Sequence, residues 1–414
     1  MADFPRWVWD IPERFNIGVA CTDAHLDTPV AERAAVIVDD DTAGVRQATF
    51  TELAAATSRF AELLRQLGIP RGARVLIRLP NCLAYPVIFL GAMKRAAIPV
   101  PTSVLLTPEE VIHLARDSGA TAVVTDRTSW GALQGAFEGL DHLTHALLVG
   151  AGEARSARLR VLPLDAALAG ITRFEDAEPT RAEDPAYLVY TSGTTGYPKG
   201  VLHAHRALLG RQPSSTYWFD FRPEGDRVLH SGRFNWTYVL GTGLMDPLYR
   251  GHTAIVHEGP SDAALWPRLI AQHGATIFIG VPTLYRQILQ KTRATRADVP
   301  PLRHCMSAGE HLSEAVLHGW RERFGLDIHE GLGMTECSYY LSQTKSRPIR
   351  PGSAGFAQPG HDEVLAYGRR RLASYKAPKV VYLVDELPRT PNGKVLRRAL
   401  APARARARSR ARQR

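Results

Sequence analysis

Hydrophobic and polar residues follow one another along this chain in two patterns, which predict alternating helices and strands. Apolar positions in Phe50–Leu67 recur at helical spacing, and Thr51 is a plausible N-cap for that helix. Arg74–Leu79 then has the short apolar composition of a strand. Both patterns recur later, and they predict helices over 83–97, 107–118, 263–273, 283–291 and 313–324, and strands over 122–125, 146–149, 186–189, 253–257, 276–281 and 302–310.

This order of elements predicts an α/β fold. Parallel strands need crossover segments that are usually helices, so the rhythm favours a mostly parallel sheet with helices on its faces. The chain has 414 residues, of which 45% are hydrophobic, which is enough for several domains or one large α/β domain. No internal repeat is visible.

The composition disfavours a membrane span, a secretory signal, and a zinc or disulfide pattern of cysteines. The chain lacks a run of about 18 uninterrupted apolar residues, the length that a membrane span needs. Its first residues, MADFPRWVWD, lack the basic and then apolar segments of a secretory signal. The four cysteines are scattered and form no zinc or disulfide pattern; they are Cys21, Cys82, Cys305 and Cys337. We therefore expect reduced thiols and a cytoplasmic location.

The net charge of +10 belongs mainly to the end of the sequence. Arg397, Arg398 and the six arginines of 404–414 carry eight positive charges with no acid among them, and the rest of the chain holds 43 basic against 41 acidic residues. We expect residues 401–414 to be a disordered, solvated tail. A nucleic-acid-binding role for this tail is the third-ranked function, and steep salt dependence would distinguish it.

The most informative stretch is Tyr190–Gly200, YTSGTTGYPKG. It follows the strand expected at 186–189 and precedes Val201–Leu209, whose pattern predicts the opening of a helix. Glycine N–H groups, hydroxyls and a lysine suit a phosphate chain; the candidate residues are Thr191, Ser192, Gly193, Thr194, Thr195, Gly196 and Lys199. A flexible surface turn is the ordinary alternative. A Walker A loop does not fit, because Pro198 and Gly200 occupy its second glycine and its Ser/Thr position.

This stretch resembles the signature loop of the adenylate-forming superfamily, which includes acyl- and aryl-CoA ligases, and it matches [YF]-T-S-G-[TS]-T-G-x-P-K-G at every fixed position. The resemblance implies a large N-terminal domain of parallel and mixed sheets flanked by helices, and a smaller C-terminal α+β domain. It also implies ATP, Mg²⁺ and coenzyme A as cofactors and a small carboxylic acid as substrate. No partner beyond these is expected, and the sequence leaves the oligomeric state open.

Two further stretches match the family around the nucleotide. Ala308, Gly309 and Glu310 end a strand and resemble the turn that packs against adenine and the acyl group, although a plain strand-to-helix turn is the alternative. In HEGLGMTE, the resemblance assigns Gly331, Leu332, Gly333 and Met334 to nucleotide binding, Thr335 to phosphate and Glu336 to the magnesium ion. Leu332 stands where many members have a tyrosine, a departure typical of benzoate-type ligases. It favours an aromatic or medium-chain acid.

Three tyrosines are candidates for the acid pocket. In the family, the region 233–251 lines this pocket, which makes Tyr238 a candidate; core packing is the equal alternative. Tyr339 and Tyr340 follow the Thr-Glu pair and are candidates on the same grounds.

The end of the chain both matches the family and departs from it. PRTPNGKVLR resembles the closing motif, in which Lys394 enters the active site for adenylate formation; an exposed Pro/Asn/Gly turn is the alternative. Between Gly360 and His361, however, the family has a further segment of about a hundred residues. That segment includes a ribose-binding T-G-D motif and a G-R-x-x-D hinge, and neither occurs in this chain.

These observations predict a domain over 1–360 that binds ATP and the acid, and a C-terminal remnant over 361–400 that carries the lysine loop. They leave two principal hypotheses. The first is an ATP-dependent acid–CoA ligase that works through acyl-AMP. The second is a catalytically impaired relative that binds nucleotide or acyl group without completing the thioester. Three intact motifs favour the first, and the missing ribose and hinge motifs favour the second.

Overall fold

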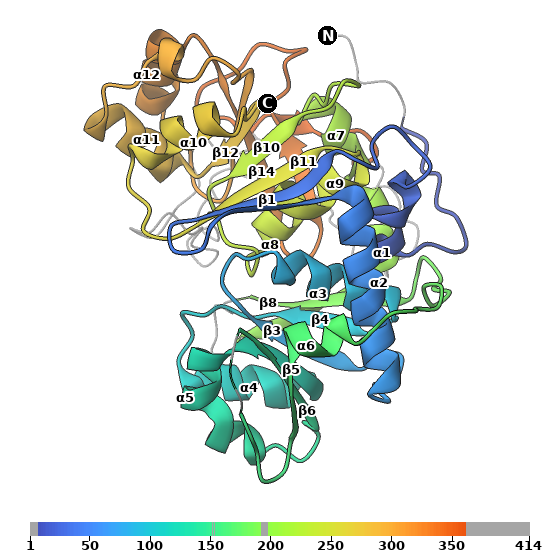
Figure 1. Ribbon diagram of the computed structural model, residues 1–414. Helices are drawn as coiled ribbons and strands as arrows, with labels where there is room; N and C mark the ends of the chain where they lie inside the picture. The colour runs from blue at the N-terminus through green and yellow to red at the C-terminus, as the bar shows by residue number, and fades with distance from the viewer. Residues whose placement is uncertain (1–6, 151, 153, 192–197, 362–414) are drawn as a thin grey trace, which may run out of the picture.

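The larger of the two main sheets has nine strands (Figure 1). The structure is a computed structural model that describes residues 7–150, 152, 154–191 and 198–361. The strand order of the larger sheet is β16-β15-β14-β13-β12-β10-β11-β1-β2. The central strands are parallel, and β2, β15 and β16 are antiparallel to their neighbours. The strands are β1 (Ala34–Asp40), β2 (Gly44–Thr49), β10 (Arg227–His230), β11 (Thr253–Glu258), β12 (Ile277–Gly280), β13 (His304–Ser307), β14 (Ile328–Met334), β15 (Ser338–Ser342) and β16 (Phe356–Ala357).

A second sheet is entirely parallel and has the order β4-β3-β5-β6-β7. A separate antiparallel hairpin, β8–β9, lies with β8 beside β4. The bounds are β3 (Arg74–Arg78), β4 (Ile98–Pro101), β5 (Ala120–Asp126), β6 (His145–Val149), β7 (Arg160–Pro163), β8 (Pro185–Thr191) and β9 (Lys199–Ala204).

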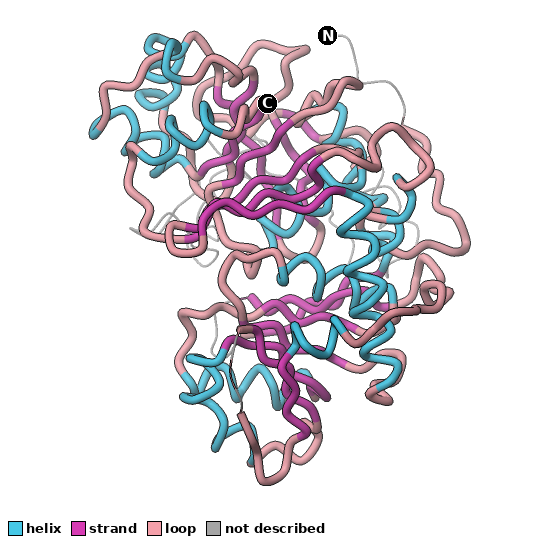
Figure 2. The backbone as a smooth tube through the Cα atoms, viewed as in Figure 1, coloured by secondary structure: helices cyan, strands magenta, loops and turns pink. Residues whose placement is uncertain are grey.

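Helices separate and cover the two sheets. They are α1 (Ile17–Ala20), α2 (Phe50–Gln66), α3 (Ala84–Lys94), α4 (Pro108–Ser118), α5 (Arg127–Glu138), α6 (Leu164–Ala169), α7 (Gln212–Tyr217), α8 (Thr237–Val239), α9 (Asp246–Tyr249), α10 (Leu265–Gln272), α11 (Pro282–Lys291) and α12 (Glu314–Phe324). A π-helical segment, Leu240–Met245, joins α8 to α9. Figure 2 shows the two groups of strands with helices between and outside them.

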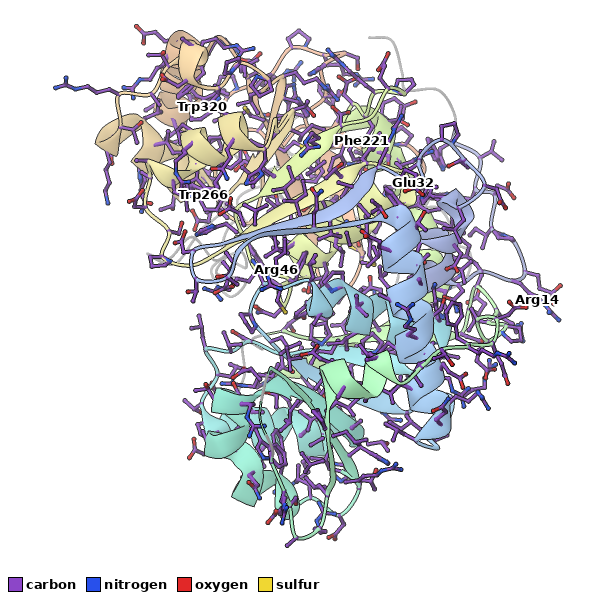
Figure 3. The ribbon with its side chains drawn as sticks, in the orientation of Figure 1. Arg14, Glu32, Arg46, Phe221, Trp266 and Trp320 are labelled. Atoms are coloured by element: carbon purple, nitrogen blue, oxygen red, sulfur yellow. The ribbon has the colours of Figure 1, made fainter. Side chains whose placement is uncertain are left out.

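Successive apolar residues of β1 face opposite layers, which explains this layered order. Val36 and Val38 of β1 pack in the same core as Phe60 of α2 and Val75 of β3, so helices fill the space between the sheets. Ile37, between those valines, faces the opposite layer. That layer is formed by α10, α11 and α12, and their tryptophans Trp266 and Trp320 are buried there (Figure 3). The outer face of the smaller sheet is covered by α4 and α5. The expected α/β class is confirmed.

One predicted element is wrong. Val201–Leu209 was expected to open a helix, but 199–204 forms strand β9, followed by short 3₁₀ turns. The reason lies in pairing, since β9 runs antiparallel to β8 with Leu188 opposite Leu202 and Tyr190 opposite Gly200. Tertiary pairing overrides the local helical spacing here. No helix in the described ranges combines the length and apolar character needed to cross a membrane.

The N-cap of α2 also differs from expectation, because Thr49 and not Thr51 caps the helix. The Thr49 hydroxyl accepts from the Glu52 N–H at 3.1 Å, and the Glu52 carboxylate accepts from the Thr49 N–H at 2.8 Å. Thr51 instead donates to Glu32 at 2.8 Å.

We therefore expect Thr49→Ala to lower the free energy of unfolding by about 1 kcal/mol, since the capping box is lost. Thr51→Ala is the matched control and should cost less, because its hydroxyl caps no helix N–H. Urea unfolding of both variants checks this, and equal losses would contradict the assignment of the cap.

Candidate active site

The β8–β9 hairpin presents the two ends of the expected phosphate loop opposite each other. Thr191 ends β8 and Lys199 begins β9, and the two are register partners. The Thr191 hydroxyl lies 3.5 Å from the Lys199 carbonyl oxygen, and the Lys199 side chain is exposed. Ser192, Gly193, Thr194, Thr195 and Gly196 lie outside the described residues, as does Lys394. The hairpin thus anchors the loop at both ends.

The second group of motif residues gathers at the carboxyl ends of two parallel strands. In β13 and β14, Ser307 is paired with Glu330, so the segments that follow both lie beyond the carboxyl end of β13, at the same edge of the parallel strands. One segment is 308–310 and the other is 331–336, which ends in the turn between β14 and β15. The sheet topology therefore brings together two stretches that the sequence separates.

Local packing or backbone conformation explains why three positions in these segments are glycine. Gly309 has φ +91°, and a Cβ there would lie 3.4 Å from the Trp236 ring. A Cβ on Gly331 would lie 2.4 Å from the Trp218 ring, and one on Gly333 would lie 2.4 Å from the Ser338 carbonyl oxygen. Gly331 thus allows the Trp218 ring to approach closely, and Gly333 allows the Ser338 backbone to do so. These contacts explain the glycines without a ligand.

The Thr335–Glu336 turn lies beside the phosphate-loop hairpin, and His203 of β9 connects the two. Its ring stacks on Tyr187 with centroids 4.5 Å apart. Burial and the charge of Arg211 lower the pKa of His203 to about 4. The Thr335 backbone and the charge of Glu336 oppose that shift, which places the turn near His203. His203 therefore stays neutral near pH 7.

A buried arginine, Arg211, contacts the first two residues of β15, which follow this turn. Arg211 donates to the Asp246 carboxylate at 2.8 and 2.5 Å, and both side chains are almost completely buried. Its third nitrogen donates to the Ser338 hydroxyl at 2.8 Å, and its guanidinium lies 4.7 Å from the Tyr339 ring centre. Burial alone would lower the pKa of Arg211, but the Asp246 carboxylate raises it well above its usual range. The start of β15 is thus fixed by a charged group.

The candidate pocket residues divide into two groups. Tyr238, Tyr339 and Ala308 belong to one buried cluster, with the two tyrosine rings 6.0 Å apart. Among the described residues, no group hydrogen-bonds the buried Tyr238 hydroxyl. Tyr340 follows Tyr339 on β15, and the strand pleat directs it to the other face. The structure therefore groups Tyr238 and Tyr339 but not Tyr340.

His230 contributes a second polar atom beside this cluster. Its ring meets the Tyr238 ring edge to face at 4.9 Å. The Gly232 N–H donates to Nδ1 at 3.0 Å, so the neutral ring carries its proton on Nε2. Burial lowers the pKa of His230 to about 3. Nε2 is a buried donor without a partner in the described part of the chain.

The remaining candidate residues differ in exposure. Glu310 accepts from the Thr283 hydroxyl at 2.6 Å. Leu332 is half-buried, and Met334 is exposed at the end of β14. Trp236 is also exposed and lies against Gly309, so two large apolar side chains reach solvent near the motif residues.

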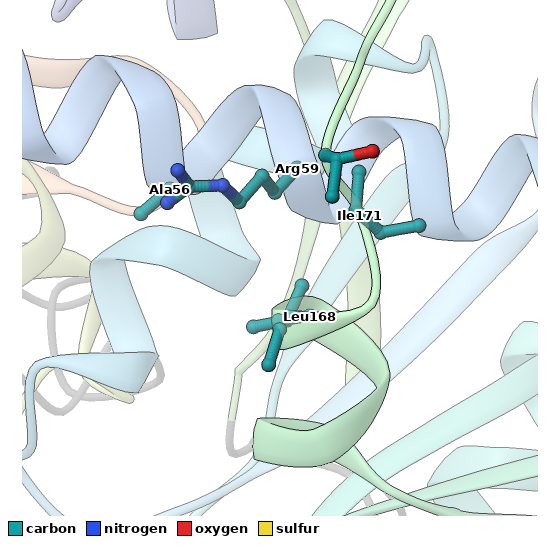
Figure 4. Close-up of a pocket in the computed structure, with 6 residues that line it drawn as sticks. Ala56, Arg59, Leu168 and Ile171 are labelled. Carbon is teal, nitrogen blue, oxygen red and sulfur yellow. The ribbon is translucent and has the colours of Figure 1, made fainter.

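A pocket elsewhere in the structure offers no comparable chemistry. It has a volume of about 570 Å³, lies between α2 and α6, and is lined by Ala56, Arg59, Leu168, Ala169, Ile171 and Thr172 (Figure 4). Arg59 is its one charged group, and none of the motif residues reaches it. We do not assign a function to it.

Sequence reasoning missed Arg211, Asp246, Trp218, His203 and His230. Arg211, Trp218 and His203 lie outside the motifs and acquire their roles from partners distant in the sequence. Asp246 lies in the region 233–251 but is identified only by its contact with Arg211, and His230 is identified by its contact with the Tyr238 ring. The sole signal in the sequence was the isolated charge of Arg211 and Asp246 within largely apolar surroundings, and isolated charges are common in loops.

The comparisons with known proteins identify the class. The AMP-binding enzyme family matches residues 26–365 of this chain. The protein therefore belongs to the AMP-binding enzyme family, which confirms the resemblance of its motifs to adenylate-forming enzymes.

Two of the relatives within this family act on benzoate or hydroxybenzoate according to their names. The chain is 35% identical over 361 residues to the benzoate–CoA ligase of Thauera aromatica, a match that covers 85% of this chain and 64% of that one. It is 31% identical to a 3-hydroxybenzoate–CoA/4-hydroxybenzoate–CoA ligase of the same organism, with 76% and 59% covered. The chain thus spans less than two thirds of the length of either relative.

Solved structures agree with this assignment. An anthranilate CoA ligase in complex with anthranoyl-AMP superposes with a TM-score of 0.75 at 27% identity, covering 85% of this chain and 66% of that one. A benzoate CoA ligase from Burkholderia xenovorans LB400 gives a TM-score of 0.73 at 28% identity, with 84% and 66% covered. The fold is therefore that of aryl-CoA ligases.

Proposed function

We propose that this protein activates an aromatic carboxylic acid of the benzoate type with ATP and transfers the acyl group to coenzyme A. The observation that carries the proposal is that the Thr335–Glu336 turn lies near the β8–β9 hairpin, whose loop is flanked by Thr191 and Lys199. The relatives named as benzoate and hydroxybenzoate CoA ligases support the substrate class. A medium-chain acid is the second substrate class to test.

In the first reaction, a carboxylate oxygen attacks the α-phosphorus of ATP. The bond from that phosphorus to the bridging oxygen breaks, and pyrophosphate leaves with the electron pair. Two anions must approach, so the site must position them and neutralise their charge. In this proposal Lys199 and the loop that it closes bind the β- and γ-phosphates, and the hydroxyl of Thr335 donates to the phosphate that is transferred.

The described residues fit a magnesium ion at this place. The Glu336 carboxylate is exposed and makes no hydrogen bond or ion pair with any described residue. An anionic oxygen that is free to reorganise suits this hard cation. We infer that Glu336 would hold Mg²⁺, which supplies positive charge next to the phosphates. Arg211 fixes Ser338 and Tyr339 at the start of β15, shortly after this residue.

Other residues would contact the acid and the nucleotide. Tyr238 and Tyr339 form an apolar, aromatic wall suited to a benzoate ring. The backbone of 308–310 and of 331–334 would pack against the nucleotide. Lys394 would bridge the carboxylate and the α-phosphate. In the second reaction the CoA thiolate attacks the acyl carbon, and AMP leaves with the electron pair of the carbon–oxygen bond.

Pyrophosphate release tests the proposal. Purified protein is incubated with ATP, Mg²⁺ and either benzoates or medium-chain acids, and Lys394→Ala is assayed beside it. We expect release that requires a benzoate and falls by about 10²-fold or more in Lys394→Ala. Benzoyl-CoA formation is then followed separately after CoA is added.

The same experiment distinguishes the impaired relative. Because the chain lacks the T-G-D and hinge motifs, a protein that binds ATP but releases no pyrophosphate with any acid would support this second function. Release of pyrophosphate without thioester formation would restrict the activity to the first reaction. Release that is unaffected by Lys394→Ala would contradict the assigned role of the lysine.

A further inference from the structure

A cluster of two aspartates and one histidine lies at the carboxyl ends of β1 and β11, apart from every residue assigned above. Asp39 and His257 are register partners on these parallel strands, and Asp41 follows directly after β1. One ligand atom from each of the three residues lies within 4.8 Å of the others. We propose that this cluster binds a first-row divalent transition metal, with Zn²⁺ as the expected ion.

His257 gives the strongest indication of a ligand. Its side chain is only 2% exposed, yet neither ring nitrogen has a hydrogen-bond partner among the described residues. Nδ1 lies 3.7 Å from Asp39 Oδ1, and Nε2 lies 3.7 Å from Asp41 Oδ2. These separations are too long for hydrogen bonds. An imidazole ring gives only one nitrogen to an ion, so only one of these two pairs would flank the metal. Its 3.7 Å separation is close to the roughly 3.5 Å between two atoms that each bind zinc at about 2.1 Å, and the third ligand atom lies within 4.8 Å of both.

Asp39 carries the outer contacts that a metal ligand usually has. Its Oδ2 lies 2.6 Å from His273 Nε2 and accepts from Gln272 Nε2 at 3.0 Å, which leaves Oδ1 directed at His257. Hydrogen bonds of this kind orient metal-binding carboxylates. Gln272 and His273 both lie at the end of α10. They bind Oδ2 of Asp39, and Oδ1 is left to face His257.

The charge balance of the cluster also calls for a cation. The Asp39 side chain is only 9% exposed, and within the described ranges its ion-pair partners are histidines and not a lysine or arginine. A buried carboxylate needs a compensating charge. Asp41 adds a second carboxylate that is partly exposed. A divalent ion would neutralise both.

Local packing fixes this geometry and leaves one side open. The Trp266 ring meets the His257 ring edge on, with centroids 6.3 Å apart. Gly259 lies under Asp41, and a Cβ there would come within 2.4 Å of the Asp41 carboxylate, so only glycine allows this approach. Asp41 is the exposed member and can move toward the other two when the ion binds. Water would complete the coordination.

The chemistry of the donors favours zinc over magnesium or calcium. An imidazole nitrogen with carboxylate oxygens suits Zn²⁺ and its neighbours, whereas Mg²⁺ and Ca²⁺ take oxygen ligands alone. A histidine also sets this cluster apart from the Glu336 site, which has only oxygen donors. The inference therefore stands whether or not the proposed ligase activity is confirmed.

Calorimetric titration of tag-free, chelator-treated protein with ZnCl₂ tests the proposal. We expect one equivalent to bind, and the affinity to fall by about 10- to 100-fold in Asp41→Asn and in His257→Gln. Asp141→Asn and His318→Gln are matched controls at exposed positions outside the cluster and should bind as the wild type does. Glu336→Gln should also retain the zinc, which separates the two metal sites.

Two further readouts keep the outcome clear. Co²⁺ bound in place of zinc should give visible absorption bands that are lost in Asp41→Asn, an exposed change that leaves the core intact. Zinc should also raise the melting temperature of the wild type and not of His257→Gln. If zinc fails to bind, or binds equally well to both cluster variants, the proposal is overturned.

Discussion

Arg211→Met is expected to lower the free energy of unfolding by about 3–5 kcal/mol, because it leaves the buried Asp246 carboxylate without its charge partner. Both side chains of this pair are at most 2% exposed, so water cannot replace the lost hydrogen bonds. Urea unfolding followed by circular dichroism measures the loss. Arg206→Met is the matched control, since Arg206 pairs with Glu183 on the surface, and the control should change stability by less than about 1 kcal/mol.

A double variant separates stability from function at this position. Replacing a buried ion pair by apolar side chains of similar volume is often nearly neutral, so Arg211→Met combined with Asp246→Leu should recover much of the stability. Pyrophosphate release should nevertheless stay about 10- to 100-fold low, since Ser338 and Tyr339, shortly after the Thr335–Glu336 turn, no longer have the donor that fixes them. Full activity in a stable double variant would show that Arg211 acts on stability alone. Wild-type stability in the single variant would contradict the energetic argument.

Glu336→Gln is expected to lower pyrophosphate release by about 10²- to 10³-fold while the free energy of unfolding changes by less than about 0.5 kcal/mol. The substitution keeps the shape of the side chain and removes the negative charge that would hold Mg²⁺. Because Glu336 is exposed and makes no hydrogen bond or ion pair with a described residue, no stabilising contact is lost. Initial rates at several Mg²⁺ concentrations test this, and the variant should need more Mg²⁺.

A neighbouring carboxylate provides the control for that experiment. Glu314 begins α12 at an exposed position, and Glu314→Gln should leave both the rate and the Mg²⁺ dependence unchanged. Equal rates for Glu336→Gln and the wild type would remove Glu336 from the metal site. If the wild type releases no pyrophosphate, the comparison moves to ATP binding with and without Mg²⁺, where Glu336→Gln should abolish the effect of the ion.

Sequence patterns alone predicted the family, the α/β class and the positions of most helices and strands. These follow from short-range information: hydrophobic periodicity marks an element, and a run such as 190–200 matches the signature loop of a family. The Thr335–Glu336 pair was identified in the same way, because its neighbours in the sequence define its motif. The roles of these residues remain predictions that the assays above test.

The contacts between these segments became known only from the folded structure. Strand β9 forms because β8 lies opposite it, although its own pattern resembles a helix. Arg211 meets Asp246, and His257 meets Asp39, through contacts between segments far apart in the chain. Such partners leave no local trace, since hydrogen bonding and burial depend on position in space and not on spacing in the sequence. For this reason the sequence predicted the motifs, while the arginine that contacts β15 and the aspartate–histidine cluster became visible only in the fold.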